Sequence, residues 1–139
     1  MDVALEGVMA PTIVHVCYGY ATLGRKRLDH GYAAVLETIA ASRASGIAVE
    51  YEQPGHEPDL LRHCGDKTVV LGVLNLGNHT VERPEYIAER IEAALDVVPA
   101  ERLHLGPDCG MWFLPPHVAF AKTRAMVLAA ALVTERLSR

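Results

Sequence analysis

Apolar and β-branched residues gather in four short runs along the chain, and each run is bounded by Gly, Pro or Asp. Runs of this length and composition are typical of buried β-strands. The pattern therefore predicts strands over residues 12–17, 47–51, 68–74 and 103–105.

The segments between these runs repeat apolar residues at helical spacing. Residues 28–45 form the first such segment, and Gly46 supplies a helix stop. A short helix is expected over residues 58–64, and longer helices are expected over residues 84–97 and 115–137. The apolar stripe of the first helix comprises Tyr32, Val35, Leu36, Ile39 and Ala40.

Strands and helices thus alternate, which is the order expected of an α/β protein with parallel strands and right-handed crossovers. Two architectures fit this order. A flavodoxin-like open sheet normally has five strands, whereas four βα units are the second half of a (β/α)8 TIM barrel. The number of units favours the half barrel. Because we find no linker, residues 1–139 are expected to form a single domain.

Composition narrows the functional classes. The 139 residues carry a formal net charge of −4, which leaves no basic footprint for nucleic acid or a membrane surface. No apolar run approaches the roughly 18–20 residues of a membrane span, and the start of the chain does not resemble a signal peptide. The three cysteines are far apart and odd in number, which argues against a disulfide scaffold. We therefore expect a cytoplasmic protein.

Candidate metal ligands stand at the ends of the predicted strands. His15 and Cys17 are two positions apart, so on a strand both side chains point to one face. Glu50 closes the second strand, and Cys109 follows the fourth. Because parallel strands of a barrel end at one mouth, these four side chains are expected to converge. Two thiolates, an imidazole and a carboxylate can bind zinc tetrahedrally, with the carboxylate as the most replaceable ligand.

Each of these residues also has a plainer interpretation. A histidine at a strand end is more often a hydrogen-bonded core or loop residue, and a lone cysteine more often fills apolar space. Glu50 is harder to explain in this way, because an unpaired carboxylate in an apolar strand costs several kcal/mol. From spacing alone, the zinc site and the plainer interpretation both stay open.

Five short motifs lie in or near the predicted strands. They are HVCYG at 15–19, IAVE at 47–50, LGVLN at 71–75, PAERL at 99–103 and PDCG at 107–110. In this order and at this spacing, they resemble the C-terminal catalytic barrel of cobalamin-independent methionine synthase. The resemblance runs from Pro11 to the final helix, and PAERL with PDCG is its most specific part.

The resemblance implies that zinc is bound by His15, Cys17, Glu50 and Cys109, which match the family's ligands residue by residue. It also implies that the thiol of homocysteine attacks the N5-methyl group of 5-methyltetrahydrofolate and yields methionine. A thiol of pKa about 8 to 9 is only partly ionised at neutral pH, and zinc makes it a bound thiolate. Glu50 would leave the metal as that thiolate arrives.

The chain departs from the family in the size of its barrel. The family's barrel has eight βα units and this chain has only the last four, so its substrate pocket is expected to be incomplete. A half barrel also leaves strand edges and an apolar helix face unsealed. We therefore expect a homo-oligomer or a complementary N-terminal half-barrel as partner. A truncated fragment is the third explanation.

A second departure concerns proton transfer. Classical members of the family carry a histidine shortly after the strand that corresponds to the third one here, and this histidine is thought to help protonate the leaving folate. By direct count Gly77 takes that position here, and His79 stands two residues later. His79 is a candidate proton donor if the loop shifts, and a solvated loop residue otherwise.

Two other functions stay open at this point. One is a related zinc-dependent alkyltransferase that acts on another thiol, such as coenzyme M. The other is a non-catalytic zinc-binding fragment. Metal content distinguishes a zinc site from the plainer interpretation, and methionine formation distinguishes the enzyme from the fragment.

Overall fold

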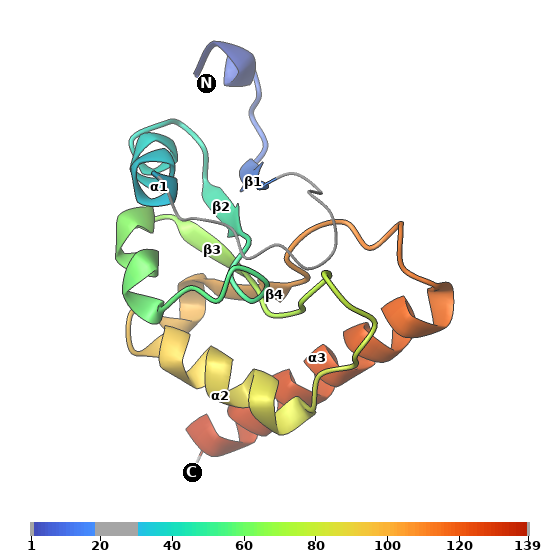
Figure 1. The fold of residues 1–139 in the computed structure, drawn as a ribbon. Helices are drawn as coiled ribbons and strands as arrows, with labels where there is room; N and C mark the ends of the chain where they lie inside the picture. The colour runs from blue at the N-terminus through green and yellow to red at the C-terminus, as the bar shows by residue number, and fades with distance from the viewer. Residues whose placement is uncertain (1, 19–30, 139) are drawn as a thin grey trace.

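The computed structural model describes residues 2–18 and 31–138. Its strands form one parallel sheet in the order β1-β2-β3-β4 (Figure 1). Each strand pairs with its neighbour in sequence, without the reversal of strand order that is found in a doubly wound sheet. This order agrees with half of a barrel and not with a flavodoxin-like sheet. The strands are β1 (Ile13–Val16), β2 (Gly46–Val49), β3 (Thr68–Gly72) and β4 (Leu103–Gly106).

Helices follow the strands as predicted. In Figure 1, α1 lies to the left of the sheet, and α2 and α3 pass below it. α2 packs along α3, and α1 packs against a 3-10 helix that precedes β3. The bounds are α1 (Tyr32–Ala40), α2 (Pro84–Leu95) and α3 (Pro116–Leu137), with 3-10 helices at Asp2–Leu5, Pro58–Cys64 and Ala100–Arg102.

The predicted helix over residues 28–45 is too long at its C-terminal end, because α1 ends at Ala40. The side chain of Ser42 explains the early stop. Its hydroxyl donates to Ile39 O at 2.7 Å and accepts from Ala44 N at 3.2 Å. Local bonds of this kind compete with helix continuation. The part of the prediction before residue 31 lies outside the described residues.

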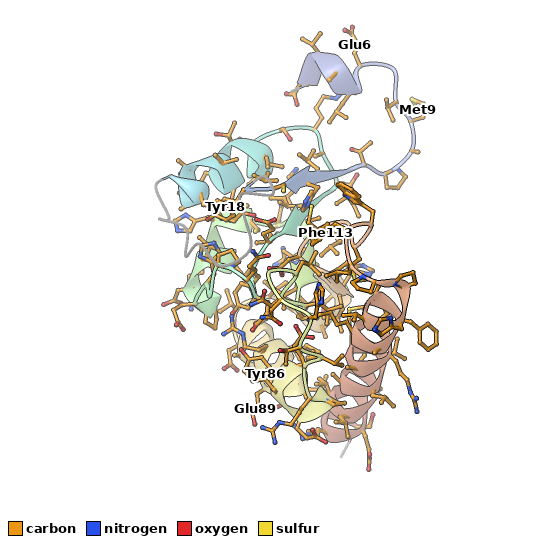
Figure 2. The ribbon with its side chains drawn as sticks, turned by 45° about the vertical axis from the view of Figure 1, so that its right-hand side comes forward. Glu6, Met9, Tyr18, Tyr86, Glu89 and Phe113 are labelled. Atoms are coloured by element: carbon orange, nitrogen blue, oxygen red, sulfur yellow. The ribbon has the colours of Figure 1, made fainter. Side chains whose placement is uncertain are left out.

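The core lies between the sheet and its helices. Apolar side chains of β2 and β3 alternate inward and meet the buried stripes of α1 and α2. Figure 2 shows these side chains, with Tyr18 beside the start of α1. The core residues from these four elements include Leu36, Ile39, Ile47, Val49, Val69, Leu71, Ile87 and Ile91, each at most 4% exposed.

The outermost strands of this sheet, β1 and β4, each pair on one side only within the described part of the chain. Ile13 on β1 is 53% exposed. Large apolar side chains on α3 are also exposed, namely Phe120, Val127, Leu128 and Leu137. An open strand edge and an open apolar helix face are what the sequence predicted for half of a barrel.

α3 is both long and apolar, although no apolar run in the sequence predicted a membrane span. By length and composition alone it could cross a membrane, with a mean hydropathy of 1.3 over its most apolar window. However, α3 packs along α2 and fully buries the side chain of Lys122 against the domain. Only 28% of that window is buried, so packing within the fold accounts for part of its apolar composition and the open apolar face for the rest.

Candidate metal centre

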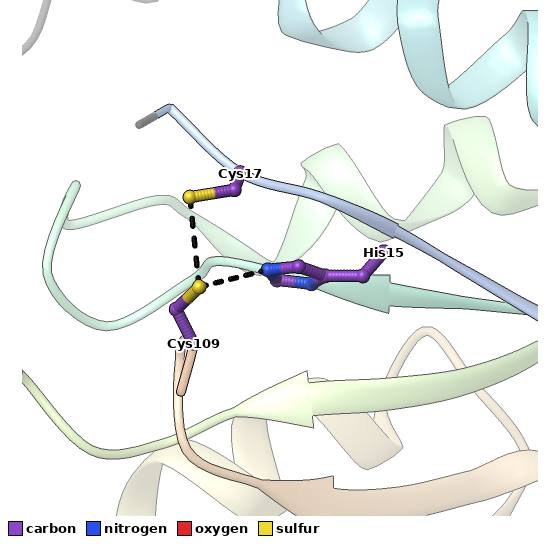
Figure 3. Close-up of side chains that lie close together, drawn as sticks. All are labelled: His15, Cys17 and Cys109. Atoms are coloured by element: carbon purple, nitrogen blue, oxygen red, sulfur yellow. Dashed lines mark hydrogen bonds between the residues drawn. The ribbon is translucent and has the colours of Figure 1, made fainter. Parts of the chain in front are cut away.

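Three side chains meet in one cluster, and they come from the two outermost strands of the sheet and the loops that follow them (Figure 3). His15 lies on β1, Cys17 follows β1, and Cys109 lies in the loop after β4. His15 Nε2 lies 3.1 Å from Cys109 Sγ, and Cys109 Sγ lies 3.5 Å from Cys17 Sγ. The ligand atoms of the three residues all lie within 4.8 Å of one another. Residues 92 positions apart in sequence thus converge, as the parallel topology predicted.

The orientation of His15 is set by the neighbouring strand. His15 stands in register with Ala48 on β2, and its Nδ1 lies 3.2 Å from Ala48 O. A carbonyl oxygen only accepts hydrogen bonds, so the ring proton sits on Nδ1 and the lone pair of Nε2 faces Cys109. A backbone carbonyl that fixes the tautomer in this way is the usual support of a metal-binding histidine.

Glu50, the other predicted ligand, lies directly beside this cluster but outside the group of three. Glu50 is the first residue after β2, and it is only 6% exposed. Its Oε1 lies 3.4 Å from Cys17 Sγ, and its Oε2 accepts a hydrogen bond from Tyr18 N at 3.0 Å. The carboxylate is therefore held next to the thiol of Cys17, one member of the cluster.

The donor set of the cluster suits zinc. Two sulfur atoms around a tetrahedral zinc ion lie about 3.8 Å apart, and a sulfur and a nitrogen lie about 3.5 Å apart. The Cys17–Cys109 distance of 3.5 Å and the His15–Cys109 distance of 3.1 Å are both close to these values. Two sulfur ligands and an imidazole also favour zinc over magnesium or calcium, which prefer oxygen.

Asp108 links the loop that carries Cys109 to the loop that follows Glu50. The residue is 1% exposed. Its carboxylate accepts hydrogen bonds from the backbone N–H groups of Tyr51 at 3.3 Å, Glu52 at 3.1 Å and Gln53 at 2.6 Å. Burial raises the pKa of Asp108 to about 7, although these three N–H groups oppose the shift. The bonds fix the two loops relative to each other.

Tyr32 supports the same region from α1, and sequence reasoning saw in it only an apolar helix position. Its hydroxyl donates to Val16 O at 3.1 Å and accepts from Glu50 N at 3.1 Å. Burial is the main reason that the pKa of Tyr32 lies far above its usual range, so the hydroxyl keeps its proton at neutral pH.

His79, the candidate proton donor, lies exposed in the loop between β3 and α2 and is not part of the cluster. Lys122 holds this loop from α3. Its ammonium donates to Asn75 O at 2.9 Å, to Thr80 O, and to both carboxylate oxygens of Glu82. Lys122 is another residue that sequence reasoning missed, because lysine is almost never fully buried.

Two further side chains, those of Glu52 and Cys64, serve the fold and not the cluster. Glu52 turns toward α2, where it accepts from Tyr86 Oη at 2.6 Å and from Arg90 Nε at 2.9 Å. Cys64 is 1% exposed, and burial raises the pKa of its thiol to about 11. Cys64 is therefore a buried apolar filler, in contrast to Cys17 and Cys109.

Comparison with known proteins assigns the chain to a family. The family model described as "Cobalamin-independent synthase, Catalytic domain" matches residues 13–132. This chain belongs to the cobalamin-independent methionine synthase family. The strand-end motifs that suggested the resemblance all lie within the matched segment.

Individual members of the family show the same relationship. The chain is 30% identical to a methionine synthase of Saccharolobus solfataricus over 98% of its own length, and 28% identical to one of Sulfurisphaera tokodaii over 96%. Its fold is similar to that of a B12-independent methionine synthase from Shewanella sp. W3-18-1 in complex with selenomethionine. That match has a TM-score of 0.88 at 29% identity and covers 99% of this chain.

The chain spans only part of these proteins. It covers 38% of the Saccharolobus relative, 36% of the Sulfurisphaera relative and 42% of the Shewanella structure. In this chain, the segment that the family model matches contains the cluster of His15, Cys17 and Cys109.

Proposed function

We propose that this chain is the zinc-binding C-terminal half of a methionine synthase barrel, formed as a single domain by residues 1–139. The observation that carries the proposal is the convergence of His15 Nε2, Cys17 Sγ and Cys109 Sγ within 4.8 Å. Membership of the family supports the same assignment.

Zinc would be held by His15, Cys17 and Cys109, with Glu50 as the fourth ligand. Bound there, zinc would lower the pKa of the homocysteine thiol and stabilise its thiolate. His15 contributes a fixed lone pair, because Ala48 O holds its ring proton. Glu50 would contribute a carboxylate, and its Oε2 already accepts a hydrogen bond from Tyr18 N, which would still hold the carboxylate if the substrate thiol replaced it as a ligand.

The reaction proposed is methyl transfer from 5-methyltetrahydrofolate to homocysteine. The sulfur–methyl bond forms while the bond from the methyl carbon to N5 breaks, and the electron pair stays on N5. That nitrogen then takes a proton, for which His79 is the candidate donor. Because His79 is exposed in its loop, this role requires the loop to close over the bound 5-methyltetrahydrofolate.

The chain would work with a partner. Its open β1 edge and the exposed apolar side chains on α3 support association with another surface. We propose a complementary N-terminal half-barrel or a second copy of this chain as that partner. A cytoplasmic location suits the proposal, since reducing conditions keep Cys17 and Cys109 as thiols.

Metal analysis of the purified chain tests the zinc site. We expect about one zinc ion per chain, and we expect Cys17→Ser and Cys109→Ser to lose it. Cys64→Ser is the matched control, because Cys64 is buried away from the cluster and should not affect the zinc content. Stoichiometric zinc in both ligand variants would overturn the site.

An activity assay tests the reaction. The chain is incubated with homocysteine and 5-methyltetrahydrofolate, alone and together with the first four βα units of a relative, and methionine is measured. Methionine formation that depends on Cys109 supports the proposal. Zinc binding without turnover in either mixture would favour an alkyltransferase acting on another thiol, or a non-catalytic zinc-binding fragment.

A further inference from the structure

The hydroxyl of Tyr32 occupies an unusual place between two strands. Tyr32 is the first residue of α1 and is 4% exposed. Its ring stacks on Tyr18 at 4.6 Å and on His56 at 5.2 Å between ring centroids. This stack directs the hydroxyl to the gap between Val16 O and Glu50 N, and it bonds both at 3.1 Å.

That gap is where the next rung of the β1–β2 ladder would form. The ladder begins with Gly46 N donating to Thr12 O at 3.0 Å. Rungs from β2 to β1 recur every two residues in a parallel pair, so the third rung would join Glu50 N directly to Val16 O. The Tyr32 hydroxyl is inserted in its place and bonds both groups.

The insertion sets a distance that matters for the cluster. Two hydrogen bonds through an oxygen atom separate backbone groups more widely than one direct bond of about 2.9 Å. Cys17 directly follows Val16, whose carbonyl accepts from the hydroxyl, and the amide of Glu50 donates to that hydroxyl. The hydroxyl therefore controls how far Cys17 stands from Glu50. In the structure, Cys17 Sγ lies 3.4 Å from Glu50 Oε1.

We propose that Tyr32 is a positioning residue of the metal centre, and that its hydroxyl holds the ends of β1 and β2 apart so that Cys17 and Glu50 can bind one ion. The inference rests on the proposed zinc centre. Without the hydroxyl, Glu50 N and Val16 O can bond to each other directly. The fold would then survive, but the two ligands would be displaced.

Tyr32→Phe tests this proposal, and Tyr51→Phe is its matched control. Tyr51 is also buried beside Glu50, yet its hydroxyl has no hydrogen-bond partner in the described part of the chain. Each variant loses one buried hydroxyl and keeps its ring. The readouts are zinc affinity by competition with a chromophoric chelator and the absorption spectrum of the Co²⁺ form.

We expect Tyr32→Phe to bind zinc about 10-fold or more weakly, the loss typical when a group that supports a metal ligand is removed. The Co²⁺ spectrum should change with it, whereas Tyr51→Phe should match the wild type in both readouts. Wild-type affinity in Tyr32→Phe would overturn this inference alone. A wild-type chain that binds no zinc would overturn the metal centre and the inference together.

A second measurement needs no variant and applies even if Tyr32→Phe does not fold. In the wild-type chain, the hydroxyl proton of Tyr32 should exchange slowly and show a nuclear Overhauser contact to the Glu50 amide. A Glu50 amide without this contact would contradict the inserted rung.

Discussion

Lys122 and Glu82 form an ion pair that is almost completely removed from water. Lys122 Nζ lies 2.8 and 3.0 Å from the two carboxylate oxygens of Glu82, and the two side chains are 0% and 9% exposed. The same carboxylate accepts a hydrogen bond from Asn75 N. The pair thus joins α3 to both ends of the loop that carries His79.

Replacing Lys122 should be costly. Lys122→Met leaves the Glu82 carboxylate buried without its cation, and breaking a buried pair in this way costs about 3–5 kcal/mol. Urea denaturation should show this loss in the free energy of unfolding. Arg136→Met is the control, because Arg136 also lies on α3 and forms an ion pair, with Glu92 of α2, that is exposed. Exposed pairs contribute little, so an equal loss in both variants would contradict the argument.

The three backbone bonds of Asp108 give a second prediction. Asp108→Ala leaves three N–H groups without their acceptor and should lower the free energy of unfolding by at least about 3 kcal/mol. Asp108→Asn keeps one oxygen, which can still accept from Tyr51 and Glu52, so its loss should be clearly smaller. Urea denaturation ranks the variants, and equal stability of the two would refute the role given to the carboxylate.

The glycine pair at the ends of β3 and β4 gives a third prediction. Gly72 and Gly106 stand in register. A Cβ on Gly72 would lie against Asp108 Oδ1 and 2.6 Å from Val49 O, whereas one on Gly106 would meet only Val70 Cγ1 at 3.1 Å. Gly72→Ala should therefore cost at least about 2 kcal/mol, and Gly106→Ala under about 1 kcal/mol. Thermal unfolding of the two variants measures the difference, which should vanish if backbone crowding is unimportant.

Thiol reactivity gives a fourth prediction, with a defined pH dependence. Burial favours the neutral thiol of Cys64 and raises its pKa to about 11, so at pH 8 only about one molecule in a thousand carries the thiolate. An aromatic disulfide reagent should titrate two thiols in the metal-free chain at pH 8, those of Cys17 and Cys109. Zinc should protect both, and urea should expose the third. A third fast thiol in the folded chain would contradict the burial of Cys64.

The strand ends could be predicted from the sequence because parallel strands have a simple geometry. The i, i+2 spacing of His15 and Cys17 fixes one face, and the βα order brings Cys109 to the same edge. Tyr32 and Lys122 could not be assigned in this way. Their roles depend on one hydroxyl entering a ladder and one ammonium closing a loop, and an apolar stripe on a helix contains no signal for either. The end of α1 was missed for a similar local reason, the hydrogen bonds between the Ser42 hydroxyl and neighbouring backbone groups.

The cluster connects the first strand of the sheet to the loop after the last one. β1 has four residues and pairs only with β2 in the described part of the chain, so it is prone to fray. Bonds from His15 and Cys17 to an ion shared with Cys109 would anchor β1 across two intervening strands. Occupancy of the site and attachment of the N-terminal segment then become one equilibrium. Chelation of the metal should therefore make the chain around residues 8–14 the first place where a protease cuts.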